Sequence, residues 1–287
     1  MANVNPPIED LNQLPTAPNT HYPVQQQVQR WQWRDGMTLQ GGPDVLACEV
    51  PAALVYNGLA HVVMMVSPQQ LEAFARGFTL AEGIARTVAD IYDIEVREVA
   101  SGIEIHVELA SACFAALKER RRQLAGRTGC GLCGVEQLAE VFRPLPVLPH
   151  SVRLALPALN QALESLPVQQ VLSQATGCAH AAAWLRLDGQ LVEVCEDVGR
   201  HVALDKLIGC RALADWGAGV ALVTSRASYE MVQKAAAAGI EILVAVAAPT
   251  ALAVQMAEQY GLTLLGFARP GRVNVYTHPL RLLTEDV

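Results

Sequence analysis

The chain has 287 residues, of which 52% are hydrophobic and only 5% aromatic, so a large core of aliphatic side chains can form. Its net charge of −7 argues against a broad nucleic-acid surface, because binding to the phosphate backbone requires clustered Lys and Arg. No apolar run is long enough to span a bilayer, and the first residues lack the basic and apolar regions of a signal peptide. We therefore expect a cytoplasmic protein that contacts neither nucleic acid nor membrane.

The first elements predict an extension followed by a β-hairpin. Residues 1–36 are rich in Pro, Asn and Gln and show no periodicity, so we expect a disordered extension over residues 1–40. Between Val45 and Val66, two apolar runs flank Asn57-Gly58. This pair is typical of a two-residue type I′ turn, in which both central residues need positive φ.

A β-rich N-terminal domain is predicted over residues 41–143. Ser67-Pro68 supplies an N-cap and a first-turn proline for a helix that runs to about Gly83. Apolar residues then alternate with charged ones over 92–109, interrupted by Ser101-Gly102, which predicts a second hairpin with one solvated face. An amphipathic helix over 114–124 leads into a glycine-rich segment with two cysteines, and a short helix follows it.

A proline-rich linker over residues 144–150 separates this part from a C-terminal domain over residues 151–287. A helix begins near Pro157, and a hairpin covers 179–195. Strands and helices then alternate, at 220–224, 228–238, 240–247, 250–260 and 262–267. Consecutive βαβ units form a parallel sheet covered by helices, so the fold class is α/β with an α+β N-terminal part.

In open α/β sheets, ligands bind outside the carboxyl ends of the strands, where helix N-termini also point. The polar residues at these ends are Ser225, Arg226, Ser228, Thr250, Arg269 and Arg272. Hydroxyl caps and arginines on one edge favour a phosphate or pyrophosphate site in an otherwise acidic protein. The alternative is that the hydroxyls are ordinary N-caps and the arginines are solvated.

The segment Glu196–His201 crowds titratable groups onto a turn before a predicted helix. Arg200 and His201 are candidates to hold a second anionic group, with Asp197 orienting them. The alternative is a capping cluster with surface ion pairs, which contribute little stability.

The segment Gly126–Gly134 surrounds Cys130 and Cys133 with four glycines. Such glycines favour a mobile arm or a tight turn over a packing site. Cys133 precedes a predicted helix N-terminus, which stabilises a thiolate, and Arg127 acts in the same direction. The pair is therefore predicted to perform nucleophilic sulfur chemistry.

Three kinds of cysteine chemistry compete at this site. A structural zinc site needs four ligands, and a single CxxC supplies only two. Cys178 and His180 would have to complete the site, and we therefore expect no zinc. A thioredoxin-like site would follow a strand, whereas this CxxC follows a helix. In a sulfur relay, one cysteine carries a persulfide and its neighbour helps to release the sulfur. The spacing alone leaves redox chemistry and relay open.

The thiols expected to be small buried hydrophobes are Cys113, Cys178, Cys195 and Cys210.

Several motifs together resemble the successive sequence blocks of the formate dehydrogenase accessory sulfurtransferases, the FdhD family. The resemblance covers residues 45–280 in order. The blocks lie at Thr128–Glu136, Thr176–Ala182, Glu196–His201, Leu204–Gly209, Ser225–Lys234, Ala248–Thr250 and Gly266–Arg269.

This resemblance implies a homodimer whose C-terminal domain is a three-layer sheet similar to the cytidine deaminase fold without its zinc. It implies a sulfurtransferase that takes sulfur from a cysteine desulfurase and passes it to the bis-guanine-dinucleotide molybdenum cofactor, before that cargo enters formate dehydrogenase. Cys130 would carry the persulfide, and Cys133 would be its partner. The alternative function is a cofactor-binding chaperone whose CxxC is redox-active or structural.

The resemblance also assigns the segment from Phe267 to Arg272 to the cofactor and its guanine nucleotide moiety. Together with the strand-end residues, the predicted cofactor-binding set is Phe267, Ala268, Arg269, Pro270, Gly271, Arg272, Ser225, Arg226, Ser228, Thr250 and His201.

Overall fold

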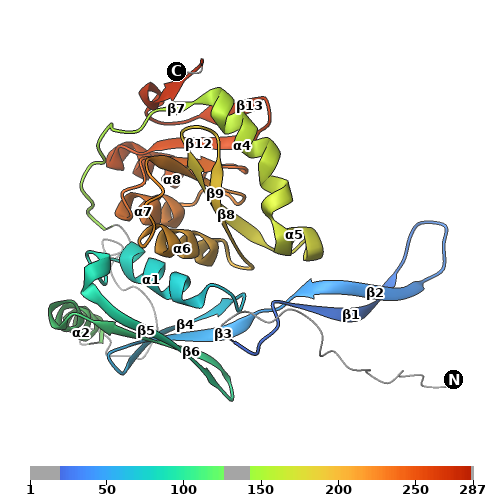
Figure 1. The fold of residues 1–287 in the computed structure, drawn as a ribbon, viewed down its shortest axis with the longest axis horizontal. Coiled ribbons are helices and arrows are strands. Elements are labelled where there is room, and N and C mark those ends of the chain that lie inside the picture. The colour runs from blue at the N-terminus through green and yellow to red at the C-terminus, as the bar shows by residue number, and fades with distance from the viewer. Residues whose placement is uncertain (1–19, 126–142, 286–287) are drawn as a thin grey trace.

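The computed structural model describes residues 20–125 and 143–285, and two β-sheets organise it (Figure 1). The smaller sheet has the strand order β4-β3-β6-β5. Its strands are β3 (Val50–Tyr56), β4 (Leu59–Val66), β5 (Ile91–Val99) and β6 (Gly102–Leu109). Both predicted hairpins are present, and Asn57 and Gly58 have φ of 45° and 80°, as a type I′ turn requires.

Two helices, α1 (Leu71–Ala81) and α2 (Ser111–Ala125), pack against the smaller sheet. Helix α2 lies where the sequence predicted it, whereas α1 begins later than predicted. Helix α2 buries Leu117, as its apolar stripe predicts. Helix α1 begins after Gln70, so the predicted N-cap at Ser67 is wrong. Ser67 Oγ instead accepts a hydrogen bond from Val198 N at 3.2 Å, because this serine joins the two halves of the molecule. A 3-10 turn, η1 (Val88–Asp90), precedes β5.

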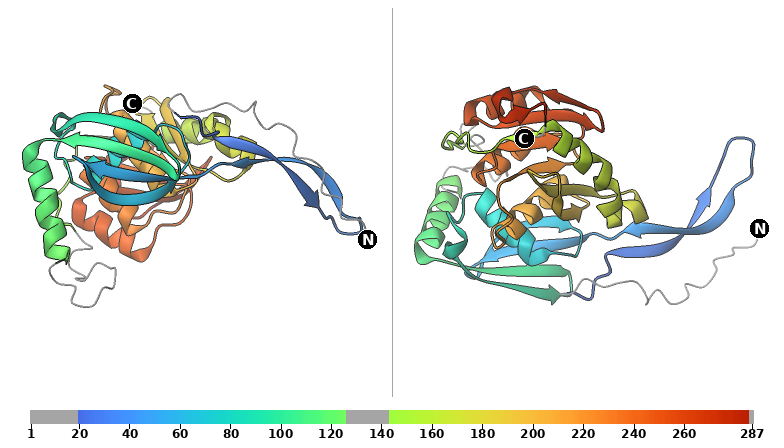
Figure 2. Two further views of the ribbon diagram at one scale, coloured as in Figure 1. Left: turned by 90° about the horizontal axis from the view of Figure 1, so that it is seen from below. Right: turned by 45° about the horizontal axis from the view of Figure 1, so that its top comes forward.

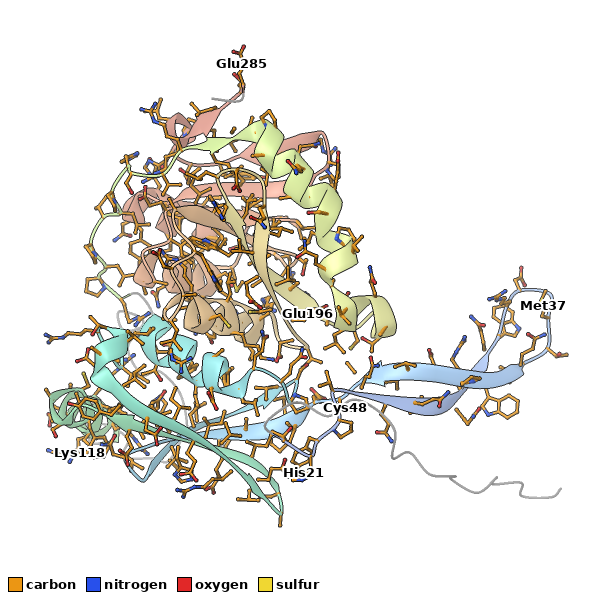
Figure 3. All side chains as sticks on the ribbon, viewed as in Figure 1. His21, Met37, Cys48, Lys118, Glu196 and Glu285 are labelled. Atoms are coloured by element: carbon orange, nitrogen blue, oxygen red, sulfur yellow. The ribbon has the colours of Figure 1, made fainter. Side chains whose placement is uncertain are left out.

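A two-stranded ribbon, β1 (Gln25–Gln32) and β2 (Gln40–Ala47), extends away from the body (Figures 1 and 2). Met37 lies at its far end (Figure 3). The prediction of a disordered extension is therefore wrong for these residues. Strand β1 is mostly glutamine and lacks the apolar alternation that a packed hairpin shows, which explains why the pattern gave no strand signal.

The larger sheet is mixed and has the strand order β13-β12-β11-β10-β8-β9. Its strands are β8 (His180–Arg186), β9 (Leu191–Asp197), β10 (Gly219–Val223), β11 (Ile242–Ala245), β12 (Thr263–Arg269) and β13 (Arg272–Val275). Strands β10, β11 and β12 are parallel, as predicted, whereas β8 and β13 pair antiparallel to their neighbours. A short parallel pair is formed by β7 (Leu154–Ala155) and β14 (Leu282–Leu283), and a 3-10 turn, η2 (Pro279–Arg281), immediately precedes β14.

Helices cover both faces of the larger sheet. The helices of this part are α4 (Leu156–Gln169), α5 (Val171–Thr176), α6 (Arg200–Arg211), α7 (Tyr229–Ala237) and α8 (Ala251–Tyr260). Side chains of α4 share one hydrophobic cluster with one face of the sheet, and those of α6, α7 and α8 share another with the opposite face. The result is a helix–sheet–helix arrangement, in which the carboxyl ends of β10, β11 and β12 adjoin the starts of α7 and α8.

Helices α1 and α6 cross at unusually close range and connect the two sheets (Figure 1). A Cβ atom placed on Gly77 would lie 1.7 Å from Asp205 O, and one placed on Gly209 would lie 1.8 Å from Ala73 O. Only glycine fits at both positions, because backbones at this spacing leave no room for a side chain.

Within the described residues, no helix combines the length and apolarity needed to cross a membrane.

Candidate functional site

Two loops and one residue of β12 meet where the parallel strands end, and we call them the strand-end edge: Ser225–Ser228, Ala247–Thr250 and Phe267. Backbone hydrogen bonds join them, from Thr250 N to Ala227 O at 3.0 Å and from Phe267 N to Ala247 O at 3.1 Å. The structure therefore brings together the hydroxyl residues and part of the segment that the sequence predicted as a ligand site. This grouping follows from parallel strands, whose carboxyl ends share one edge.

The two predicted hydroxyl caps differ at the helix starts. Thr250 is an ordinary N-cap, since its side chain accepts a hydrogen bond from Ala253 N at 3.2 Å. Ser228 is the N-cap residue of α7, but its Oγ is buried and has no hydrogen-bond partner among the described residues. A buried hydroxyl without a partner is uncommon, because desolvation of a polar atom is unfavourable. Ser228 Oγ at a helix N-terminus is thus free to bind an acceptor or donor atom of a ligand.

Phe267 has a strained backbone at the strand-end edge. Its φ is 52°, in the left-handed region that non-glycine residues rarely adopt, and the register of β12 shifts between Gly266 and Arg269. The phenyl side chain is 41% exposed. Backbone strain of this kind collects at ligand sites, where the surrounding structure imposes it. An exposed aromatic ring beside the helix starts offers a stacking surface.

Arg269 and Arg272 line one cavity of about 530 Å³ between β12, β13 and α4. Its other walls include Leu159, Leu163 and Val273, and none of its described lining residues carries a carboxylate. Arg269 Nη1 donates to Val246 O and Ala268 O, which holds the guanidinium near the carboxyl end of β11. A cationic and apolar cavity of this kind suits an anion that also carries a flat apolar group.

The remaining residues of the predicted segment shape the turn between β12 and β13. Gly271 has a φ of 77°, and its N–H donates to Asn160 Oδ1 at 2.5 Å, so the turn is held against α4. Ala268 is buried, and Pro270 lies in the turn itself. Arg226 is exposed and does not line the cavity of Arg269 and Arg272. Two of the three predicted arginines therefore converge.

His201 lines a different cavity, of about 310 Å³, which also borders Arg120, Arg143 and Glu230. We call it the interlayer cavity, because its walls come from β4, α1 and α2 on one side and α6 and α7 on the other. His201 Nε2 lies 2.7 Å from Glu230 Oε2. Burial lowers the pKa of His201, and Glu230 acts in the opposite direction. The structure does not bring His201 into the cavity of Arg269 and Arg272.

Cys130 and Cys133 lie outside the described residues. The chain is described again from Arg143, whose N–H donates to Gln233 Oε1 at 3.1 Å and whose carbonyl accepts from Tyr260 Oη at 2.8 Å. Arg143 also lines the interlayer cavity. The described residue that follows the cysteine segment is thus anchored in the same cavity as His201 and Arg120.

The acidic turn before α6 has a structural role that the sequence reading missed. Asp197 does not orient Arg200 and His201; its Oδ2 lies 2.7 Å from Lys206 Nζ and accepts from Ser67 N at 2.9 Å. Both charged side chains are fully buried. The helical position of Lys206 gave a signal, since Lys206 lies between Leu204 and Leu207, which are buried on α6.

A second buried pair, Asp205 and Lys234, was not predicted as a contact. Lys234 Nζ lies 2.9 Å from Asp205 Oδ1 and 2.8 Å from Glu82 Oε1. This cluster ties α6 and α7 to the end of α1. Residues far apart in the sequence make these contacts, so no local spacing could reveal them.

The cysteines of the described residues also differ from expectation. Cys195 is buried, as predicted, and Cys113 and Cys210 are partly buried. Cys178 is exposed, so the prediction of a buried hydrophobe is wrong there. It follows Gly177, which ends α5 with a positive φ, and the chain leaves the surface only at β8.

Comparison with known proteins assigns the chain a family. The model of the FdhD/NarQ family matches residues 47–283. Among solved structures, the chain is similar to the crystal structure of a candidate formate dehydrogenase accessory protein from Desulfotalea psychrophila. The two share 25% identity with a TM-score of 0.70, and the match covers 91% of this chain and 100% of the other. The matched range of the family model begins at the end of β2, so most of the ribbon precedes it.

Proposed function

Because this chain belongs to the FdhD/NarQ family, we propose that it acts in the maturation of formate dehydrogenase. The similar structure from Desulfotalea psychrophila is described as a candidate accessory protein of that enzyme. In finer terms, we propose a sulfurtransferase that takes sulfur from a cysteine desulfurase and delivers it to the bis-guanine-dinucleotide molybdenum cofactor, which is its cargo. The working form would be a homodimer that hands the loaded cofactor to formate dehydrogenase.

The sulfur steps require only two thiols. The Cys130 thiolate attacks the outer sulfur of a persulfide on the desulfurase, a new S–S bond forms at Cys130, and the donor cysteine leaves as a thiolate. Cys133 then attacks the inner sulfur of Cys130, which forms a disulfide and releases hydrosulfide for the cofactor. A dithiol reductant restores both thiols.

The proposed cargo site is the strand-end edge together with the cavity of Arg269 and Arg272. The two guanidinium groups would bind phosphate oxygens, and Ser228 Oγ would supply a hydrogen bond at the start of α7. Phe267 and the apolar wall would contact the flat guanine base. The bound cofactor supplies the metal centre that later performs formate chemistry in the client enzyme.

The main support for the proposed binding of the cofactor is one cavity. Two arginines and no described carboxylate line it, in a protein of net charge −7. In such a protein, anion binding has to be local. The cavity lies where an α/β sheet is expected to bind ligands.

Calorimetry with guanosine diphosphate tests the cargo site. We expect Arg269→Ala and Arg272→Ala each to weaken binding about 10-fold or more, because each removes a charge-assisted contact. Arg97→Ala is the matched control, since Arg97 is exposed on β5 and pairs with Glu95. Unchanged affinity in both cavity variants would remove this site from the proposal.

Mass spectrometry after incubation with a cysteine desulfurase and cysteine tests the sulfur steps. One added sulfur atom is expected on Cys130 and should be absent in Cys130→Ala. Cys178→Ala removes an exposed thiol and serves as the control. If Cys130→Ala still supports active formate dehydrogenase in cells while nucleotide binding is intact, the protein is a cofactor chaperone that moves no sulfur.

A further inference from the structure

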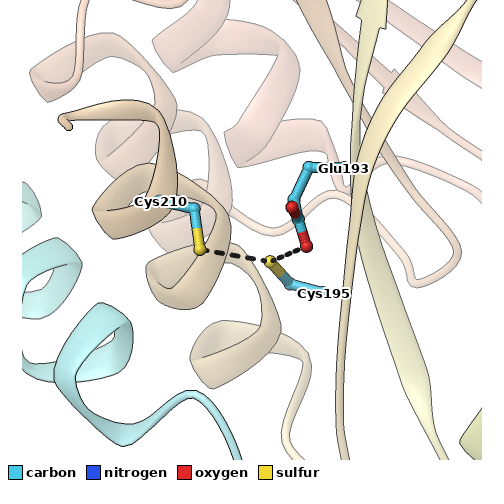
Figure 4. A group of neighbouring side chains, drawn as sticks. All are labelled: Glu193, Cys195 and Cys210. Carbon is cyan, nitrogen blue, oxygen red and sulfur yellow. Dashed lines mark hydrogen bonds between the residues drawn. The ribbon is translucent and has the colours of Figure 1, made fainter. Parts of the chain in front are cut away.

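A second group of sulfur ligands lies between β9 and α6, within the described residues. Glu193 and Cys195 are on β9, and Cys210 is near the end of α6; Figure 4 shows their side chains pointing at one another. Cys195 Sγ lies 4.0 Å from Cys210 Sγ and 3.9 Å from Glu193 Oε1. All three ligand atoms lie within 4.8 Å of one another.

These separations fit a shared metal ion better than a covalent bond. Two sulfurs bound to a tetrahedral zinc ion at about 2.3 Å each lie about 3.8 Å apart. A disulfide needs about 2.05 Å, so the observed pair would have to close by nearly half of its separation. For a zinc ion, the two sulfur atoms would have to approach each other by only about 0.2 Å.

The supporting elements hold the three groups in place. Strand β9 pairs with β8, and α6 is packed against both β8 and α1. Gln70 Nε2 donates to the Glu193 carboxylate at 3.2 Å, which fixes that side chain from the start of α1. Metal ligands on regular elements with such outer hydrogen bonds are well ordered before the ion binds.

The site is also partly open to solvent. Glu193 and Cys210 are partly buried, and a neighbouring cavity of about 480 Å³ is lined by Gln70, Arg76 and Val194. The nearest buried cation, Lys206, is already paired with Asp197, so its charge is compensated.

We propose that Glu193, Cys195 and Cys210 bind a thiophilic divalent cation, with Zn²⁺ as the best fit. Binding replaces two S–H bonds by two metal–thiolate bonds and releases two protons, while Glu193 adds one oxygen ligand and no electron is transferred. The ion links β9 to α6, so it stabilises the packing of this helix on the larger sheet. This site is separate from Cys130 and Cys133.

The test uses the full chain with Cys130→Ser and Cys133→Ser, so that CxxC cannot bind the ion. After loading with Zn²⁺ and desalting, elemental analysis should find about one zinc ion per chain. Cys210→Ser and Glu193→Gln should weaken the affinity more than about 100-fold and about 10-fold, respectively. Cys113→Ser and Cys178→Ser are the controls and should retain the ion. Circular dichroism of each variant establishes that it is folded.

Cobalt gives a readout of the ligands themselves. The Co²⁺-loaded chain should show a sulfur-to-metal charge-transfer band that weakens in Cys210→Ser and persists in Cys178→Ser. The proposal is overturned if the chain retains no zinc, if Cys210→Ser and Glu193→Gln bind it as tightly as the parent, or if the cobalt spectrum lacks the sulfur band. Isolation of Cys195 and Cys210 as a disulfide after the zinc-loading step would overturn it as well.

Discussion

At the scale of single residues, buried charge is the feature that distinguishes this molecule. Lys206 and Asp197 are fully buried, and Lys234 pairs with the equally buried Asp205. Burial disfavours the charge on Lys234, but Asp205 and Glu82 more than compensate and raise its pKa. Such a pair adds little net stability compared with two apolar residues of the same shape at the same positions. The loss of one partner, however, leaves an uncompensated charge.

Lys234→Met should therefore destabilise the protein by about 3–5 kcal/mol, because Asp205 would remain buried without its cation. Denaturant unfolding followed by circular dichroism measures the change. Lys118→Met is the control: Lys118 is exposed on α2, and its replacement should change the free energy of unfolding by less than about 1 kcal/mol. Equal effects of the two substitutions would contradict the assigned role of Lys234.

A second residue-scale prediction concerns pH. Burial works against the charge on Glu241, but hydrogen bonds from Ser151 and Val152 and the charge of Arg281 lower its pKa overall. Between the lowered folded pKa and the unfolded value of about 4.3, the unfolded chain binds more protons, so stability rises with pH. The contribution of Glu241 is complete above the unfolded value and is lost as the pH falls through the folded one.

Glu241→Gln should consequently cost about 3–5 kcal/mol at pH 7, where Arg281 would lose its buried partner. The difference from the parent should narrow as unfolding is measured at progressively lower pH, below about 4. Glu108→Gln, at an exposed position of β6, should change the free energy of unfolding at pH 7 by less than about 1 kcal/mol. If the difference in the free energy of unfolding between Glu241→Gln and the parent stays constant with pH, this assignment is wrong.

At the scale of elements, the crossing of α1 and α6 joins the two sheets. Neither helix could approach the other so closely with a side chain at Gly77 or Gly209. The close approach also positions Asp205 of α6 beside Glu82 and Lys234. The backbone contact and the buried ion pairs thus depend on each other, and a small shift at the glycines would disturb both.

Gly209→Ala should destabilise the protein by more than about 2 kcal/mol, because its Cβ would lie 1.8 Å from Ala73 O and the helices would have to separate. Thermal unfolding with a two-state fit checks this. Gly42→Ala on the ribbon has open space around its Cβ and should change the free energy of unfolding by less than about 1 kcal/mol. Similar melting temperatures for both variants would rule out the tight crossing.

At the scale of the whole molecule, the ribbon of β1 and β2 is an appendage to the two packed sheets (Figure 1). Trp31 and Trp33 are 74% and 62% exposed, and Leu39 is 61% exposed. Two strands alone bury too little apolar surface for independent stability, so the ribbon depends on its base. The base is anchored by the hydrogen bond from Thr20 Oγ1 to Pro68 O.

Replacing residues 30–42 by an Asn-Gly turn should leave the free energy of unfolding of the body within about 1 kcal/mol of the parent, because the removed part packs mainly on itself. Guanosine diphosphate binding should also be unchanged. Parallel denaturant titrations of the shortened and full chains measure the first quantity. A loss of several kcal/mol would mean that the ribbon packs against the body.

Local patterns in the sequence determined much of the fold. Period-two alternation predicted β5 and β6, Asn57-Gly58 predicted the turn of the first hairpin, and the βαβ alternation predicted β10 to β12. The same topology predicted that Ser228 and Thr250 would share one edge with the end of β12. These predictions succeed because they depend on backbone geometry and on residues close in the chain.

Only the tertiary structure decided the rest. It showed that Ser67 binds Val198 instead of capping α1, that His201 and Arg269 belong to different cavities, and that Cys195 and Cys210 meet at Glu193. Each of these contacts joins elements whose separation in space is set by helix packing. Sequence spacing carries no information on that distance, because packing depends on the fit of surfaces from distant parts of the chain.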